Sequence, residues 1–279
     1  MKITTLVDNT THDNELFDEH GLSVHIALGK RDILFDTGMT NKFSMNAAKL
    51  DVNLRAVDVA LISHAHYDHL GGLVDFLSLN DKATVYLKKE IFDNQYVSIK
   101  DGNILERGYS EELLEHKDRF TFLKEDIMRD GELIIIKNID KDYPLPKGNK
   151  LLYTTEDNEV VGRDTFNHEL LFAIEHDNEL VMFSGCAHNG ILNMISTLKR
   201  HFPDKNIKAI HGGFHLIDTQ FTDTETDDEI TEIAHEIDKL APNAIIYTGH
   251  CTSSKAIKKM KTVLGNRLQS FYTGHEIWF

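Results

Sequence analysis

The stretch His64-Ala-His-Tyr-Asp-His69 places three imidazoles and one carboxylate within six residues. One residue, Ser63, separates it from residues 59–62, a short apolar run that favours a buried strand. A chain that leaves a strand is still nearly extended, so His64 and His66 are expected to point to the same side. Asp68 and His69 then follow on a turn, where they can face a second ion. Surface histidines on a loop are the simpler alternative. Four such residues at this spacing favour a metal site, and imidazole with carboxylate suits zinc, manganese or iron.

Residues 63–72, Ser-His-Ala-His-Tyr-Asp-His-Leu-Gly-Gly, resemble the HxHxDH signature of the metallo-β-lactamase-fold superfamily. Further segments resemble its other motifs, in order along the chain: Leu34-Phe-Asp-Thr-Gly38, Phe183-Ser-Gly-Cys-Ala-His-Asn-Gly-Ile191, Gly212-Gly-Phe-His-Leu216 and Thr248-Gly-His-Cys-Thr252. The last three resemble one branch in particular. That branch groups metal-dependent hydrolases with the dihydropterin–ribofuranosylaminobenzene 5′-phosphate synthase.

The resemblance implies an α/β fold, a four-layer αββα sandwich of two mixed sheets with outer helices. Short apolar runs predict strands at 3–7, 23–28, 32–35, 57–62, 84–87, 132–137, 170–175, 180–184, 207–211, 244–247 and 276–279. Helical spacing appears at 42–50, 191–201, 227–240 and 255–264. The predicted strands fall into two groups separated by helices, which is consistent with such a sandwich.

The sequence is expected to form a single domain over residues 1–279, with an insertion at about 88–162. This segment is rich in charged and turn residues and carries none of the motifs. In the resembling family it lies beside the active site, so we expect a cap over the pocket; a surface excursion without function is the alternative. Its aromatic residues Phe92, Tyr96, Tyr109 and Tyr153 are the ones to look for near the metals.

Composition limits the classes of partner. The 279 residues carry a net charge of −15, which argues against a general nucleic-acid binder held by phosphate contacts. No signal peptide and no apolar run of about 18 residues is recognised, so we expect a cytoplasmic protein that does not enter membranes. Cys186 and Cys251 lie next to motif residues, which suggests metal chemistry or reduced thiols more than a disulfide. Homodimerisation is common among such enzymes and stays open.

The resemblance extends the ligand set beyond the first motif. The family counterpart of His250 completes the second ion. Many superfamily members have a bridging Asp at the position of Cys186, and a ligand His upstream of it. Here the obvious histidine is His188, downstream, so His188 is expected to complete the first ion and His168 competes with it. Cys186 is either a thiolate ligand or a small buried residue.

Other motif positions are expected to support the centre. Asp36 is expected to fix a ligand loop by hydrogen bonds from outside the metal shell. Asp68 should ligate one ion and orient the nucleophile, and His215 should stabilise charge or protonate the leaving group. Gly213 would let substrate oxygens approach the backbone. Asp8-Asn9 resembles a family motif near the pocket, although a simple turn is equally plausible. Histidines without supporting spacing are expected at the surface or in packing: His12, His20, His25, His116, His176, His201, His235 and His275.

The resulting hypothesis is a metal-dependent hydrolase that uses two divalent ions, zinc first and manganese or iron as alternatives, to generate hydroxide near neutral pH. A small anionic substrate, a phosphoester or cyclic phosphate, is favoured because a metal pair stabilises both attacking and leaving oxygens. One alternative is a pterin-precursor synthase that releases pyrophosphate. A redox diiron protein is another, although diiron relatives carry Glu at the position of His66 and a flavin domain. A metal-binding sensor without turnover is the last.

Overall fold

The computed structural model describes residues 1–157 and 159–279. In this part of the chain, two seven-stranded sheets hold most of the strands. The first sheet runs in the order β18 (Glu276–Trp278), β1 (Lys2–Val7), β2 (Ser23–Leu28), β3 (Arg31–Phe35), β4 (Val59–Leu61), β5 (Thr84–Leu87) and β8 (Phe120–Phe122). The second runs in the order β17 (Leu268–Ser270), β16 (Ile245–Thr248), β15 (Ile207–Gly212), β14 (Glu179–Ser184), β13 (Leu171–His176), β10 (Leu133–Ile136) and β9 (Ile127–Asp130).

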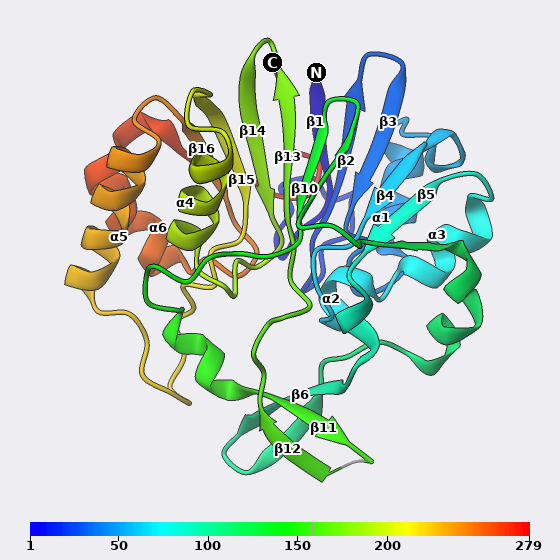
Figure 1. Ribbon diagram of the computed structural model, residues 1–279, viewed down its shortest axis with the longest axis horizontal. Coiled ribbons are helices and arrows are strands. Elements are labelled where there is room, and N and C mark those ends of the chain that lie inside the picture. Colours follow the sequence, from blue (N-terminus) through cyan, green and yellow to red (C-terminus); the bar gives the residue numbers. More distant parts are fainter. Residues whose placement is uncertain (158) are drawn as a thin grey trace.

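Both sheets are mixed. In the first, β18, β1, β2 and β3 pair antiparallel, whereas β3, β4, β5 and β8 pair parallel. In the second, β14 to β17 pair parallel and β14, β13, β10 and β9 antiparallel. The chain termini lie close together at the top of Figure 1 because β1 pairs with β18.

The two sheets face each other across an apolar core. Alternate residues of a strand point to opposite faces, so Ile33 and Phe35 of β3 enter this core while Leu34 faces the outer helices. The ring of Phe35 lies 5.6 Å from that of Phe172 and 6.0 Å from that of Phe183, both from the opposite sheet. These contacts join the sheets into one sandwich.

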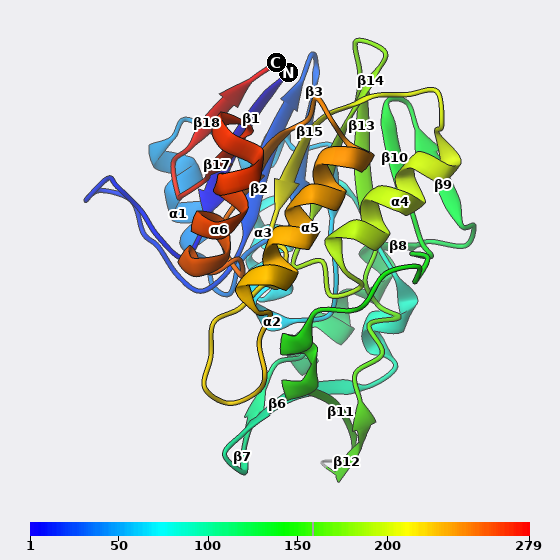
Figure 2. The same ribbon diagram turned by 90° about the vertical axis from the view of Figure 1, so that its left-hand side faces the viewer.

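Helices cover both outer faces, as Figures 1 and 2 show. On the first sheet lie α1 (Lys42–Lys49) and α3 (Leu73–Leu79). On the second lie α4 (Ile191–His201), α5 (Asp227–Leu240) and α6 (Ser254–Leu264). The short α2 (Tyr67–Leu70) follows β4. Short 3₁₀ helices are η1 (Leu54–Ala56), η2 (Lys89–Phe92), η3 (Glu111–Arg119), η4 (Lys147–Leu151) and η5 (Gly265–Arg267). The predicted four-layer αββα sandwich is confirmed.

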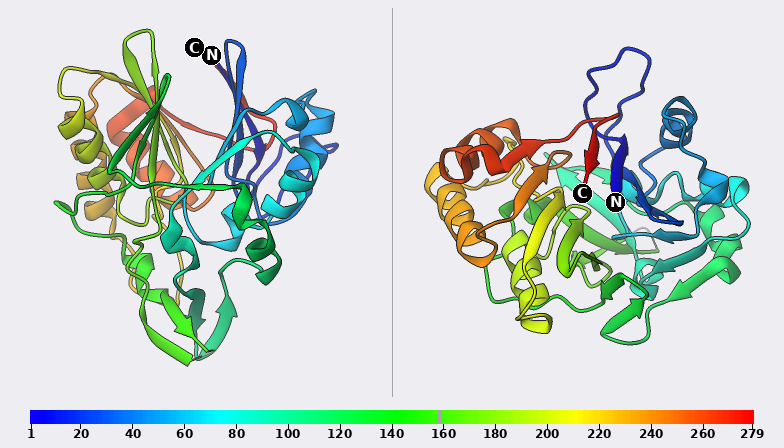
Figure 3. Two further views of the ribbon diagram at one scale, coloured as in Figure 1. Left: turned by 45° about the vertical axis from the view of Figure 1, so that its right-hand side comes forward. Right: turned by 90° about the horizontal axis from the view of Figure 1, so that it is seen from above.

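A third, four-stranded sheet projects from one end of the sandwich (Figures 1 and 3). Its order is β12 (Glu159–Arg163), β11 (Leu152–Glu156), β6 (Gln95–Lys100) and β7 (Asn103–Glu106). The proposed cap at about 88–162 remains a prediction; its residue 158 lies outside the described residues. Within that range β8, β9 and β10 pair in the two main sheets, so only part of the segment forms the projecting sheet.

The sequence missed α2, α3 and the short strands β6 to β9, β11, β12 and β17, because each is too short to show a clear hydrophobic period. The predicted strand at 57–62 is shorter, since the structure limits β4 to Val59–Leu61. Among the described residues, no helix has both the length and the apolar character needed to cross a membrane.

Candidate metal centre

The carboxyl ends of the parallel strands of both sheets meet at one edge of the sandwich. There Asp36 follows β3, the motif follows β4, Cys186 and His188 follow β14, His215 follows β15 and His250 follows β16. Ligands of open α/β sheets commonly bind at such an edge. Topology therefore brings together motifs that lie up to about 200 residues apart.

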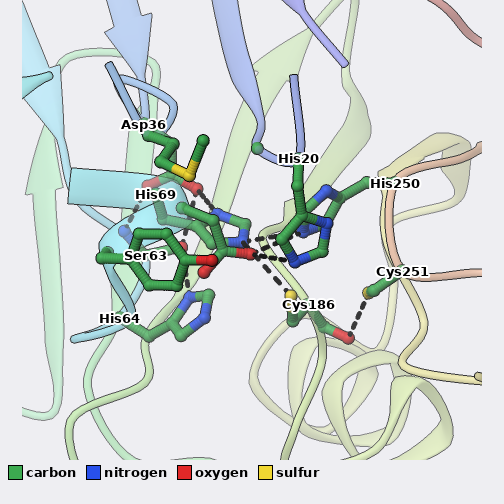
Figure 4. Close-up of polar contacts among 12 residues, drawn as sticks. His20, Asp36, Ser63, His64, His69, Cys186, His250 and Cys251 are labelled. Carbon is green, nitrogen blue, oxygen red and sulfur yellow. Dashed lines mark hydrogen bonds and ion pairs between the residues drawn. The ribbon is translucent and has the colours of Figure 1, made fainter. Parts of the chain in front are cut away.

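Two adjoining groups of buried side chains can each hold a metal ion. His64, His66 and His188 form the first, with one nitrogen of each ring within 4.8 Å of the others. Asp68, His69, Cys186 and His250 form the second within the same limit. Figure 4 shows His64, His69 and His250 turned towards one another beside Cys186.

Distances within the second group are short. The Nε2 atom of His69 lies 3.0 Å from Nε2 of His250 and 3.2 Å from Sγ of Cys186. Asp68 Oδ2 lies 3.4 Å from His250 Nε2 and 3.7 Å from His69 Nε2. Such donors suit zinc, which accepts histidine, carboxylate and thiolate.

Each imidazole of both groups has one ring nitrogen held by a neighbouring side chain. These partners are Ser63 Oγ for His64 (2.7 Å), Asp164 Oδ2 for His66 (3.4 Å), Asp36 Oδ2 for His69 (2.7 Å), Asn149 Oδ1 for His188 (3.0 Å) and Asn9 Oδ1 for His250 (3.0 Å). In the described chain, Nε2 of His64 and of His188 is buried without a hydrogen-bond partner. Metal-ligating histidines are oriented in this way, with the second nitrogen bonded to an outer group. The donor set therefore fits a metal centre.

Asp36 connects the two groups. Its Oδ2 accepts a hydrogen bond from Ser63 Oγ at 2.7 Å and lies 2.7 Å from His69 Nδ1. Its Oδ1 accepts from the Ser63 backbone N–H at 2.7 Å. Because Ser63 also contacts His64, one buried carboxylate fixes the start of the motif and a ring in each group.

His168 lies beside the first group, but both of its ring nitrogens already have partners. Nδ1 accepts from the Ala65 backbone N–H at 3.1 Å, and Nε2 lies 3.0 Å from Asp164 Oδ2. Asp164 also contacts His66, so this pair supports the motif loop from behind. Burial raises the pKa of Asp164, but the neighbouring His168 and His66 outweigh burial and hold that pKa below its ordinary value. Sequence reasoning missed Asp164, which lies in a segment without motif.

Two further carboxylates hold the loops that carry His188 and His250. Glu169 accepts hydrogen bonds from the backbone N–H of His188 at 2.8 Å and of Asn189 at 2.7 Å. Asp8 Oδ1 accepts from the backbone N–H of His250 at 2.9 Å. Asn9 Nδ2 donates to the His250 carbonyl at 3.0 Å. Asp8 and Asn9 thus lie at the site, where they hold His250 and are not among the candidate ligands. Glu169 was not predicted from the sequence.

A third group joins Cys186, His215 and Cys251, whose ligand atoms also lie within 4.8 Å of one another. Both cysteines are free and buried. The side chain that Gly213 lacks would meet Cys251 Sγ at 2.4 Å, so that sulfur fills the space expected for substrate oxygens. Both ring nitrogens of His215 lack a hydrogen-bond partner among the described residues.

Several residues at this edge have strained backbones. Asp36, Ala187, His215 and His250 have φ between 50° and 58°, the left-handed region that residues with a Cβ rarely adopt. Such outliers persist where surrounding contacts over-determine them, commonly at functional sites.

A pocket of about 270 Å³ opens onto both groups. His66, Asp68, His188, His215 and His250 line it, with residues that the sequence had not singled out: His20, Lys100 and Arg107. The expectation that His20 is a surface or packing histidine is incomplete, because its Nε2 lies 3.3 Å from Asp68 Oδ2. His20 lies in a polar loop, where no spacing of ligand-type residues pointed to the site.

Arg107 and Lys100 come from the projecting sheet. The Tyr67 backbone N–H donates to the Arg107 carbonyl at 2.6 Å, and Arg107 Nη1 donates to Tyr67 Oη at 2.7 Å. The hairpin of β6 and β7 is therefore tied to the helix that carries Asp68. Of the four aromatic residues singled out, only Tyr96 packs against the histidines, with its ring 4.6 Å from that of His168.

Burial lowers the pKa of both His64 and His188 well below the ordinary value, which keeps them neutral as metal binding requires. Burial raises the pKa of Asp68, but His69 and His250 outweigh it and hold this carboxylate ionised. His64 and His188 thus offer neutral rings to an ion, and Asp68 offers a carboxylate.

Comparisons with known proteins agree with this geometry. A family model, the metallo-β-lactamase superfamily, matches residues 17–142. The chain is 27% identical over 269 residues to the 7,8-dihydropterin-6-methyl-4-(β-D-ribofuranosyl)-aminobenzene-5′-phosphate synthase of Methanocaldococcus jannaschii, covering 92% of this chain and 89% of that protein.

Solved structures extend the likeness to the whole fold. The crystal structure of Tm1679, a metal-dependent hydrolase of the β-lactamase superfamily, superposes with a TM-score of 0.83 at 28% identity, over 100% of this chain and 99% of that one. Zn²⁺-bound PqqB from Methylobacterium extorquens has a TM-score of 0.61 at 11% identity, with 100% of each chain covered, which is a likeness of fold alone.

Proposed function

Because this chain belongs to the metallo-β-lactamase superfamily, we propose that it is a hydrolase of small phosphoesters or cyclic phosphates that uses two divalent ions, zinc first. The observation that carries the substrate class is the cationic wall of the pocket. Lys100 and Arg107 line the same cavity as both histidine groups, in a chain of net charge −15. Two such side chains in the pocket of a candidate metal centre favour an anionic substrate.

Each residue of the pocket has its own role in the proposed hydrolysis. Divalent ions held by the two groups would supply an activated water near neutral pH and would polarise the phosphoryl oxygens. Arg107, fixed by Tyr67 and by Ser98 Oγ at 3.0 Å from its Nε, presents its remaining donors to a non-bridging oxygen. Asp68 accepts the proton of the nucleophile, and His20 at 3.3 Å can pass that proton towards solvent.

His215 also lines the pocket. Its ring lies 4.2 Å from that of His188, and its nitrogens have no hydrogen-bond partner in the described chain. An imidazole there can donate a proton to the leaving oxygen. Asp36, His168 and Asp164 keep the motif loop in position throughout.

The test is a substrate panel with the zinc-loaded and the manganese-loaded protein. It contains bis(p-nitrophenyl) phosphate, p-nitrophenyl phosphate, a 2′,3′-cyclic nucleotide, p-nitrophenyl acetate and a lactone. We expect turnover of a phosphodiester or cyclic phosphate that disappears in Asp68→Asn. Turnover confined to the carboxylic ester or the lactone contradicts the phosphoester assignment.

A second candidate is supported by one finding, the 27% identity to the aminobenzene-5′-phosphate synthase over 92% of this chain. The same pocket would then hold two substrates, and a carbon–nitrogen bond would form with loss of pyrophosphate. Incubation with a hydroxymethyl dihydropterin diphosphate and a ribofuranosylaminobenzene 5′-phosphate distinguishes the synthase from the hydrolase. Pyrophosphate release that needs both substrates supports the synthase, and its absence excludes it.

A further inference from the structure

A second cavity of about 290 Å³ lies outside the metal centre and shares no lining residue with its pocket. Its walls are the segment Tyr143–Lys147, the start of α4, and one face of α5. Figure 2 shows α4 and α5 side by side above this segment. Nothing in the chemistry proposed above uses this cavity.

The floor of the cavity is apolar. Ile191, Leu192, Phe214 and Leu216 are buried and line it, and Ile233 adds the apolar side of α5. A ligand that fills this floor must therefore carry an apolar body.

The rim is acidic. Glu229, Glu232 and Glu236 line it from one face of α5, at spacings of three and four residues where like charges repel each other. Pro144 and Pro146 have no backbone N–H to offer a ligand. Lys147 is engaged, since its Nζ donates to Glu229 at 2.6 Å.

Glu225 adds an independent observation. This carboxylate lines the cavity and is only 7% exposed. Its Oε1 accepts a hydrogen bond from the Lys147 backbone N–H at 2.6 Å. Its Oε2 is buried without a hydrogen-bond partner in the part of the chain that the structure describes. Buried carboxylate oxygens are normally paired, so this atom lacks a donor that a ligand can supply.

We infer that the cavity binds a small organic cation, a primary ammonium group on an apolar one-ring or short aliphatic body. The ammonium donates to Glu225 Oε2 and neutralises the repulsion along α5. The apolar body packs on Phe214 and Ile191. A neutral or anionic molecule of the same shape leaves Glu225 unpaired and binds more weakly.

The test compares three probes of similar size, 2-phenylethylammonium, 2-phenylethanol and phenylacetate, by isothermal titration calorimetry on the full chain. We expect the ammonium to bind at least tenfold more tightly than the alcohol, and phenylacetate not to bind. Glu225→Gln, which keeps an acceptor for Lys147, should lose at least tenfold in affinity for the ammonium. Glu276→Gln, a carboxylate on β18 that pairs with Lys2, is the matched control and should not change it.

Equal binding of alcohol and ammonium, or an unchanged affinity in Glu225→Gln, overturns the inference, as does the absence of binding. If Glu225→Gln does not fold, amide shifts of the isotope-labelled native chain decide. Shifts caused by the ammonium should centre on Leu145, Gly190 and Ile233. Shifts confined to the metal-centre pocket contradict the proposal.

Discussion

The Nε2 atoms of His69 and His250 face each other at 3.0 Å. Nδ1 of each ring lies against an acceptor, Asp36 Oδ2 at 2.7 Å and Asn9 Oδ1 at 3.0 Å. With both Nδ1 atoms donating, two Nε2 lone pairs meet, and only a proton or a metal ion between the rings relieves their repulsion. The proton and the metal therefore compete for one place.

This competition predicts proton release on metal binding. Burial lowers the pKa of His250, but the Asp68 carboxylate outweighs it and raises that pKa to about 9. Below that pH the metal-free ring holds a proton that the metal must displace. At pH 7 we expect about one proton released from this ring, and about tenfold weaker binding per pH unit below 9. Zinc titrations in buffers of different ionisation enthalpy measure the number released. Binding enthalpies that do not depend on the buffer would contradict the competition.

Replacing Asp36 tests the support of the motif. Asp36→Asn keeps the shape of the side chain but replaces one of its two acceptor oxygens with an NH₂ group. The two oxygens together hold Ser63 and His69 through three contacts, so the variant cannot keep them all. Changes at such outer partners commonly cost about 10–100-fold in metal affinity or activity. We expect a loss in that range, measured by competition with a chromophoric chelator. The exposed Asp81→Asn serves as control, and equal affinity in both variants excludes this role for Asp36.

His215→Gln tests the proton donor. An amide can hydrogen-bond but cannot transfer a proton, so kcat should fall about 10²–10⁴-fold. The metal content should stay unchanged. The exposed His201→Gln should behave as the native chain. Loss of metal together with activity would mean that His215 acts as a ligand instead.

Lys100→Ala and Arg107→Met test the cationic wall. A hydrogen bond to a charged group contributes about 1.5–3 kcal/mol, which corresponds to about 10–100-fold in kcat/KM. We expect a loss in this range for anionic substrates, mostly in KM, and a weaker dependence on salt. Lys117→Ala, an exposed charge away from the pocket, is the control. The same loss on a neutral ester would point to a structural defect.

Candidate ligands that lie close together in the chain could be predicted from the sequence. The motif at 64–69 contributes residues to both groups, and strand-end glycines with histidine or cysteine marked the segments that join them. The main strands and helices of the sandwich could be predicted as well, because buried strands and helix faces produce a regular hydrophobic pattern in the sequence. His188 instead of His168 emerged as the partner of His64 and His66 in the structure, because Asp164 and Ala65 occupy both nitrogens of His168.

The remaining residues could not be found from spacing. Glu169 and Asp164 act through contacts with loops far away in the chain, and an isolated carboxylate carries no pattern. Lys100 and Arg107 lie on a polar hairpin whose exposed residues resemble any solvated surface. Only its pairing with β11 and its bond to Tyr67 bring it over the pocket. Long-range pairing of this kind has no local signature.

The most direct test of the metal centre is a crystal of the zinc-loaded protein, measured on both sides of the zinc absorption edge. Anomalous difference peaks should lie at two positions, one among His64, His66 and His188, the other among Asp68, His69 and His250, about 3.5–4 Å apart. A fully loaded crystal with no peak within bonding distance of these side chains would contradict the account.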